Sequence, residues 1–216
     1  MTLQLEHFIL GELSTNCYLI HDGAEAFLID PATPSWEIKE EIETRNLGLR
    51  YIINTHGHID HIGGNAFFKE HFPQAQLVIG ERDLIYLTNP DLNLSRDFSS
   101  PFISPLPDWV VRENNLFLNT PWGKLSFLLT PGHTPGSVCL FLPAENWLFS
   151  GDTLFAGSVG RTDLPGGSFR DLISSLEEIF NSFPDTVSVF PGHGPFTNLA
   201  REKKENFYYL QYLARD

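Results

Sequence analysis

Cysteine is scarce in this chain of 216 residues. The two cysteines, Cys17 and Cys139, each lie within an apolar stretch, and two thiols cannot form the disulfide framework that stabilises small secreted domains. We interpret both as small buried hydrophobic residues rather than as reactive or metal-binding thiols. A chain that does without disulfides suits a reducing compartment, so we expect a cytoplasmic protein.

Positive charge is also in short supply. The 14 Lys and Arg residues are outnumbered by 27 Asp and Glu residues, which gives a net charge of −13. Nucleic-acid binding draws most of its affinity from basic residues clustered on phosphates, so we expect no nucleic acid among the partners. No uninterrupted apolar run approaches the roughly 18 residues that a membrane helix needs. We therefore expect a soluble, unprocessed protein without a membrane partner.

The apolar residues, which make up 42% of the chain, alternate between strand and helix patterns. Strand patterns occupy residues 3–10, 16–20, 26–30, 49–54, 76–80, 115–119, 124–130, 137–142, 147–150 and 187–190. Helix patterns occupy residues 34–46, 65–72, 81–87, 169–180 and 201–216. Without repeats or linkers, a chain of this length predicts a single α/β domain over residues 1–216, with helices covering sheets.

The segment from Asn89 to Asp108 is rich in proline and serine and carries no regular pattern. We interpret it as a long surface loop or a lid. For its residues Asn93, Leu94 and Ser95, both a surface turn and a place near the pocket remain open.

Four apolar strand patterns end in a glycine beside a residue of metal-ligand type. They are the sequences YIINTHGHIDH (51–61), FLLTPGHT (127–134), LFSGDT (148–153) and VFPGHG (189–194). Glycine lets the chain turn sharply at each of these four places, and strands buried on both faces are rigid supports. The four strand ends can therefore converge at one sheet edge. The predicted donors are the clustered or glycine-adjacent histidines His56, His58, His61, His133 and His193, together with Asp60 and Asp152.

The donor types restrict the metal without fixing it. Three imidazoles and a carboxylate fall within residues 56–61, so two neighbouring ions can share that loop. Imidazole with carboxylate suits zinc, iron or manganese, and no cysteine lies in the four turns. Zinc is the first expectation, and iron and manganese remain open. The lone histidines His7, His21 and His71 are not taken as ligands.

The motifs THGHIDH, PGHT, GDT and PGHG resemble, in order and spacing, the metal motifs of the metallo-β-lactamase superfamily, over nearly the whole chain. The sequence GDTLFAGSVGRTDLPGGS is similar to the glyoxalase II (hydroxyacylglutathione hydrolase) branch, particularly its short bacterial type. The resemblance implies the metallo-β-lactamase fold, a four-layer αβ/βα sandwich. It also implies a first metal held by His56, His58 and His133, a second held by Asp60, His61 and His193, and Asp152 as the bridge.

The same resemblance implies the chemistry. A glyoxalase II-like binuclear metallohydrolase cleaves a thioester, such as S-lactoylglutathione or another S-(2-hydroxyacyl)glutathione, by a hydroxide that bridges two divalent metals. Asp60 and Asp152 are the catalytic residues, because Asp60 orients the nucleophile and Asp152 bridges. Some true β-lactamases of this fold carry a cysteine at the bridging position. The oxygen ligand of GDT therefore favours ester or thioester hydrolysis over lactam cleavage.

Three further positions follow from the resemblance, each with a structural alternative. Asp30 is either an acceptor that orients a ligand imidazole or a turn-forming residue before Pro31. Arg161 either contacts glutathione or forms a salt bridge within its loop. Lys203, with Lys204 beside it, either binds substrate or lies on a solvated helix face.

Two rival functions remain open. A persulfide dioxygenase shares the fold and a GRTD stretch, and it uses one iron held by two histidines and an aspartate. His193 argues against it, because a retained second site has no purpose in a one-iron enzyme. Lactonases and other hydrolases also use this fold.

Only 23 residues follow His193, whereas larger glyoxalase II enzymes continue into a helical domain that binds glutathione.

Overall fold

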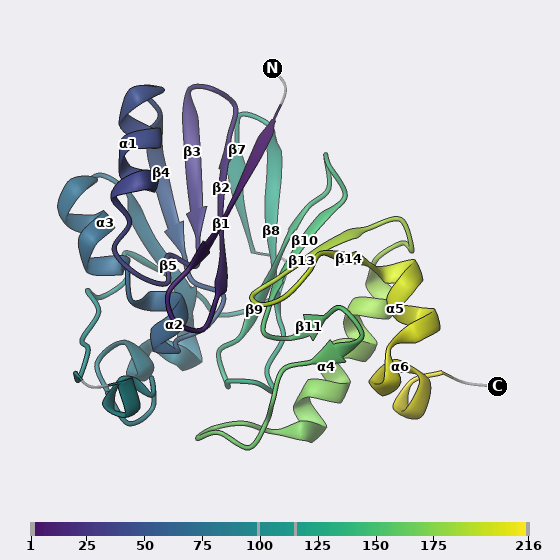
Figure 1. Cartoon of the computed structure of the whole chain (residues 1–216). Coiled ribbons are helices and arrows are strands. Elements are labelled where there is room, and N and C mark those ends of the chain that lie inside the picture. The colour runs from purple at the N-terminus through teal and green to yellow at the C-terminus, as the bar shows by residue number, and fades with distance from the viewer. Residues whose placement is uncertain (1–2, 99, 115, 215–216) are drawn as a thin grey trace. The chain divides into compact units, whose positions relative to one another are not determined.

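The structure is a computed structural model that describes residues 3–98, 100–114 and 116–214. The chain divides into two units, Met1–Val111 and Arg112–Asp216, each built around its own six-stranded sheet (Figure 1). A single domain over residues 1–216 stays a prediction. Ser99 of the predicted loop, Asn115 at the start of a predicted strand and the last two residues of the predicted C-terminal helix lie outside the described residues.

The first unit has a mixed sheet in the order β1-β2-β3-β4-β5-β6. Strands β1, β2 and β3 pair antiparallel, and β3, β4, β5 and β6 pair parallel. Asp22 and Gly23 lie in the turn between β2 and β3, where the Asp22 carboxylate accepts from the amides of Ala24 and Glu25. The strands are Gln4–Leu10 (β1), Thr15–His21 (β2), Glu25–Ile29 (β3), Gly48–Ile53 (β4), Gln76–Gly80 (β5) and Trp109–Val111 (β6).

Helices α1 and α3 cover one face of this sheet (Figure 1). Helix α1 begins where the Ser35 hydroxyl accepts from the amide of Ile38, and it buries Ile38 and Ile42 against the strands. Helix α3 adds Phe68 to the same apolar cluster. The helical segments are Trp36–Thr44 (α1), Ile59–Ile62 (α2), Asn65–His71 (α3) and the 3₁₀ helices Glu81–Leu87 (η1) and Ser95–Phe98 (η2).

The second unit has a mixed sheet in the order β14-β13-β10-β9-β8-β7 and a small hairpin, β11-β12. Strands β10 and β13 pair parallel, which brings their carboxyl ends to the same edge. The strands are Phe117–Thr120 (β7), Gly123–Leu129 (β8), Val138–Leu142 (β9), Trp147–Gly151 (β10), Leu154–Phe155 (β11), Ser158–Val159 (β12), Ser188–Pro191 (β13) and Thr197–Asn198 (β14).

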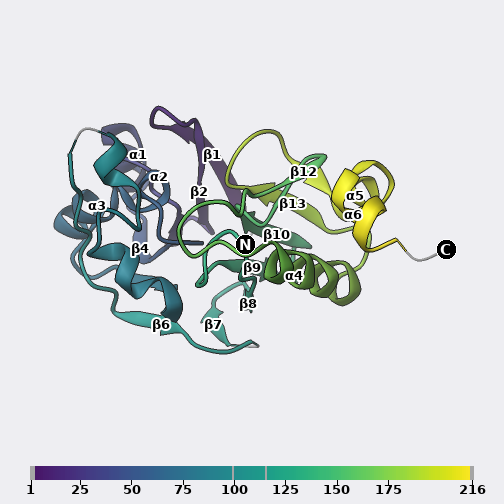
Figure 2. The same ribbon diagram turned by 90° about the horizontal axis from the view of Figure 1, so that it is seen from below.

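Helix α4 (Phe169–Ser182) runs next to β9 and β10 (Figure 2). Its apolar face, which includes Leu172, Leu176 and Ile179, packs against Leu148 and Val189 of the sheet. The C-terminal helix predicted over 201–216 is two helices in the structure, α5 (Leu199–Glu205) and α6 (Phe207–Tyr212).

The break falls at Asn206, which has an extended backbone and caps α6 through its side chain.

Within the described residues, no helix is long and apolar enough to cross a membrane. The other predicted strands and helices are found with shifts of a few residues at their ends. The predicted loop contains η2, and it leads into β6, which the sequence pattern does not indicate.

Candidate functional site

The first group of candidate donors lies in the segment that follows β4, where His56, His58, Asp60 and His61 are close in sequence. Gly57 is required there, because an added Cβ would lie 2.4 Å from the Cβ of Tyr86. The amide of Gly57 donates to the Asp83 carboxylate at 2.8 Å. This packing and this bond fix the turn that carries the histidines.

The three imidazoles of this segment are buried. His56, His58 and His61 expose 1%, 2% and 0% of their surfaces. His56 Nε2 lies 3.0 Å from His58 Nδ1, and His61 Nε2 lies 3.5 Å from Asp60 Oδ2. The predicted donors of the first unit therefore form two neighbouring pairs.

Asp30 holds this segment from the end of β3. Its buried carboxylate accepts from the amide and the hydroxyl of Thr55, both at 2.7 Å. Its Oδ2 also lies 2.9 Å from His61 Nδ1. The contact lacks the geometry of a hydrogen bond, but a carboxylate this close favours a proton on Nδ1, which leaves Nε2 for a metal. Asp30 also has a φ of +50°, so it both turns the chain and faces a candidate ligand.

The second group comes from three strand ends of the second unit. His133 follows β8, Asp152 follows β10 and His193 follows β13. The Asp152 Oδ2 atom lies 3.5 Å from His133 Nε2 and 3.6 Å from His193 Nε2. One carboxylate oxygen therefore faces two imidazole nitrogens, as a bridging ligand requires.

His133 is oriented by the backbone. Its Nδ1 lies 2.7 Å from the carbonyl oxygen of Arg161. Because a carbonyl can only accept, Nδ1 donates and the Nε2 lone pair is available to a metal. Gly160, just before Arg161, packs so closely that an added Cβ would lie 1.8 Å from the Asp152 carbonyl oxygen.

The donor atoms of each unit suit metal binding. Two nitrogen or oxygen ligands of one tetrahedral zinc, each about 2.0–2.1 Å from the ion, lie about 3.3 Å apart. The four donor pairs lie 3.0, 3.5, 3.5 and 3.6 Å apart. Neutral imidazoles with a fixed tautomer and carboxylates are ligands for zinc, iron or manganese.

The two predicted substrate-binding residues form ion pairs on the surface of the second unit. The exposed Arg161 side chain makes two 2.7 Å bonds to Asp163, which lower the pKa of the Asp163 carboxyl to about 2. Lys203 Nζ lies 2.5 Å from Asp185 Oδ1. The salt bridge considered for Arg161 is thus present, and a substrate contact by either residue stays a prediction.

The residues set aside as non-ligands have ordinary roles. Cys17 and Cys139 are fully buried, as expected, and burial raises the pKa of the Cys139 thiol to about 11. His7 pairs with Asn16, His21 with Glu6, and His71 with a carbonyl of its own helix. None of the three histidines belongs to the donor pairs.

Sequence reasoning missed two contributors to the site. Asp83 lies in η1, and nothing in its local pattern indicates that it accepts from Gly57. Arg161 was singled out for its guanidinium, but its carbonyl oxygen is the group that contacts His133. Bonds to backbone atoms leave no signal in side-chain spacing, so neither contact was predictable.

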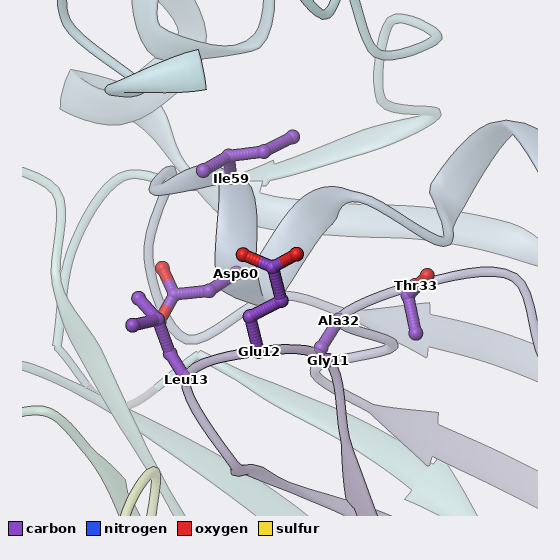
Figure 3. Close-up of a pocket in the computed structure, with 7 residues that line it drawn as sticks. All are labelled: Gly11, Glu12, Leu13, Ala32, Thr33, Ile59 and Asp60. Atoms are coloured by element: carbon purple, nitrogen blue, oxygen red, sulfur yellow. The ribbon is translucent and has the colours of Figure 1, made fainter. Parts of the chain in front are cut away.

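A cavity of about 240 Å³ lies in the first unit beside Asp60 (Figure 3). Its lining consists of the β1–β2 loop, the segment after β3 and the start of α2, namely Gly11, Glu12, Leu13, Ala32, Thr33, Ile59 and Asp60. One of the predicted catalytic carboxylates therefore borders a space that a substrate group can enter.

Comparison with known proteins defines the family. Residues 10–193 match the family model described as the Metallo-beta-lactamase superfamily. Hydroxyacylglutathione hydrolase GloC of Haemophilus influenzae is 33% identical over 206 residues, covering 94% of this chain and 97% of the relative. The crystal structure of the BLEG-1 B3 metallo-beta-lactamase matches with a TM-score of 0.88 at 31% identity, covering 95% of this chain and 99% of that one. The crystal structure of TTHA1623 in a di-iron-bound form matches with a TM-score of 0.81 at 35% identity, covering 94% of this chain and 99% of that chain.

The chain belongs to the metallo-β-lactamase superfamily. The predicted α/β metallo-β-lactamase fold and the resemblance to the glyoxalase II-like branch are confirmed. The chain is therefore a metal-dependent hydrolase whose histidine and aspartate side chains bind divalent metal ions.

Proposed function

We propose that this chain hydrolyses the thioester bond of an S-(2-hydroxyacyl)glutathione, such as S-lactoylglutathione. The placement of Asp152 carries the proposal, because its Oδ2 faces both His133 Nε2 and His193 Nε2. An oxygen donor at that position suits a binuclear hydrolase of esters and thioesters. The relative named hydroxyacylglutathione hydrolase supports the substrate class.

We propose the ligand sets that the resemblance implies, within one domain formed by the whole chain. His56, His58 and His133 hold one ion, Asp60, His61 and His193 hold the other, and Asp152 is shared. The pairs of donors found within each unit agree with this division. Zinc is the expected metal, with iron as the alternative that the di-iron form of TTHA1623 illustrates.

The bound ions supply a water of lowered pKa and a Lewis acid for the carbonyl oxygen of the thioester. The chain's own groups position the reactants. Asp60 orients the nucleophilic water, and its Oδ2 accepts from the Thr15 hydroxyl at 3.4 Å. Asp30 and the Arg161 carbonyl keep His61 and His133 in the tautomer that leaves Nε2 for a metal.

The leaving group explains why no further acid is needed. A thiol has a pKa of about 8.5, so it can depart as a thiolate near neutral pH. An amine leaving group would require a proton donor at the scissile bond. The donor sets contain no histidine left over for that task, which favours a thioester over an amide.

The test measures metal content and substrate preference on protein purified without added metal. We expect about two metals per chain and chelator-sensitive hydrolysis of S-lactoylglutathione, followed at the thioester absorbance. A panel of lactones, phosphodiesters and a β-lactam is assayed in parallel, and comparable turnover on all of them would contradict the thioester assignment. One iron per chain with oxygen consumption and no thioesterase activity would instead indicate the persulfide dioxygenase.

A further inference from the structure

The loop between β1 and β2 forms one wall of the cavity beside Asp60. It spans residues 11–14, in which Gly11 has a φ of +69° and Ser14 a φ of +55°. The amide of Ser14 donates to the carbonyl of Gly11, and the Thr15 hydroxyl donates to Asp60. The loop is therefore closed on itself and tied to the residue that borders the cavity.

Glu12 lies at the tip of this loop with an unused charge. Among the described residues its carboxylate has no hydrogen bond or ion pair. Figure 3 shows its side chain standing up from the loop, with the carboxylate toward the segment that carries Ile59 and Asp60. Next to it, Leu13 exposes 46% of its surface, a large exposed fraction for a leucine. The loop thus offers an anion and an apolar contact at the mouth of one cavity.

The size of the cavity restricts what can bind. About 240 Å³ is below the roughly 300–1,000 Å³ of sites that enclose a drug-sized ligand. The cavity therefore accommodates one part of a substrate, such as a single amino-acid moiety. Its walls combine the apolar groups of Leu13, Ala32 and Ile59 with the carboxylate of Glu12 and the hydroxyl of Thr33.

We propose that this cavity binds the ammonium group of the thiol part of the substrate, with Glu12 as its counter-ion. A primary ammonium donates three hydrogen bonds and is attracted by an unpaired carboxylate. This inference rests on the proposed function and extends that function by making Glu12 a specificity residue. It favours thioesters of amino-bearing thiols such as glutathione over coenzyme A thioesters, which lack a free ammonium.

The experiment measures binding of two non-hydrolysable thioethers, S-methylglutathione and its N-acetyl derivative, to the metal-loaded protein by calorimetry. We expect the wild type to bind the ligand with the free amine about tenfold more tightly. Glu12→Gln is expected to reduce this preference to less than about twofold, chiefly by weakening the binding of S-methylglutathione. Glu145→Gln, at an exposed glutamate in the β9–β10 turn, is the control that retains the preference. Thermal unfolding confirms that both variants are folded.

Each result decides the inference. Equal binding of the two thioethers by the wild type, no binding of either, or an equal loss of both in Glu12→Gln would overturn the role of Glu12. Thioesterase activity of the wild type is assayed separately on S-lactoylglutathione. Hydrolysis without a preference for the amine removes only this inference. A preference for the amine without hydrolysis removes the proposed reaction and leaves the ammonium site standing.

Discussion

The two units position their candidate donors in different ways. In the first unit, all of the donors lie in one short segment, residues 56–61, and buried carboxylates hold it. Asp30 contacts Thr55 and His61, and Asp83 accepts from Gly57. In the second unit, the donors come from three separate strand ends, and His133 is held by a backbone carbonyl.

The difference determines which substitutions each group of donors tolerates. A segment held by side-chain carboxylates loses its geometry when one of those carboxylates is replaced. Strand ends held by sheet pairing and a carbonyl bond are insensitive to most side-chain changes, because the contacts are made by the backbone. Apart from loss of a donor itself, they are sensitive only where the backbone is forced to move.

The largest effect is expected at Asp152, the residue that the second unit places between two imidazoles. Asp152→Ala should lower kcat/KM for S-lactoylglutathione about 10³-fold, since losing several kcal/mol of transition-state stabilisation costs about tenfold per 1.4 kcal/mol. Metal content should fall below two per chain by mass spectrometry. Glu205→Ala, which removes an exposed carboxylate paired with Arg201, is the control and should change neither quantity. Retained activity in a folded Asp152→Ala protein would refute the bridging role.

The next effect tests the backbone of the second unit. Gly160→Ala would place a Cβ 1.8 Å from the Asp152 carbonyl oxygen, so the segment after β12 must move away from the turn that carries Asp152. We expect the free energy of unfolding to fall by about 3 kcal/mol and Tm by roughly 6–12 °C, measured by calorimetry. Gly48→Ala, whose Cβ would meet Ala24 O at an ordinary 3.5 Å, should change stability by less than about 1 kcal/mol. Equal stability of the two variants would show that the β11–β12 hairpin can shift without lowering the free energy of unfolding.

The contrast between the units also explains what the sequence could predict. The strands with long apolar runs were predicted because buried sheet positions are filled by apolar residues, and a run of such residues is visible in the sequence. The donors themselves were predicted because four glycine-bounded strand ends place histidine or aspartate in the same position. In both cases the signal lies within a few consecutive residues.

The features that escaped prediction depend on contacts between distant segments. Strand β6 has only three residues, Trp109–Val111, and pairs with β5 after a long irregular stretch. The split between α5 and α6 arises from the Asn206 cap, which interrupts a continuous helical pattern. Asp83 and the carbonyl of Arg161 act on groups 26 and 28 residues away. Local periodicity carries no information about such partners.

A smaller effect is expected when a supporting carboxylate of the first unit is changed. Asp30→Asn removes the charge that faces His61 Nδ1, and loss of such a partner lowers metal affinity about 10–100-fold. Competition with a chelator measures the affinity. Asp22→Asn, a matched change at a half-buried turn aspartate of the same unit, is the control. A loss of stability in Asp30→Asn with unchanged metal affinity would reduce Asp30 to a support for Thr55.

The smallest effect is expected at Arg161, because its carbonyl rather than its side chain holds His133. Arg161→Ala should therefore change metal affinity by less than about twofold, whereas a tenfold loss would show that the guanidinium, and not only the backbone, orients the imidazole. NMR titration should show the pKa of the Asp163 carboxyl rising from about 2 toward the ordinary value for aspartate. The lowered pKa of the Asp163 carboxyl contributes stability at pH values above the ordinary aspartate pKa. This contribution is lost as the pH falls through about 2. Because Arg161 and Asp163 are exposed and screened by solvent, unfolding at neutral pH should be unchanged.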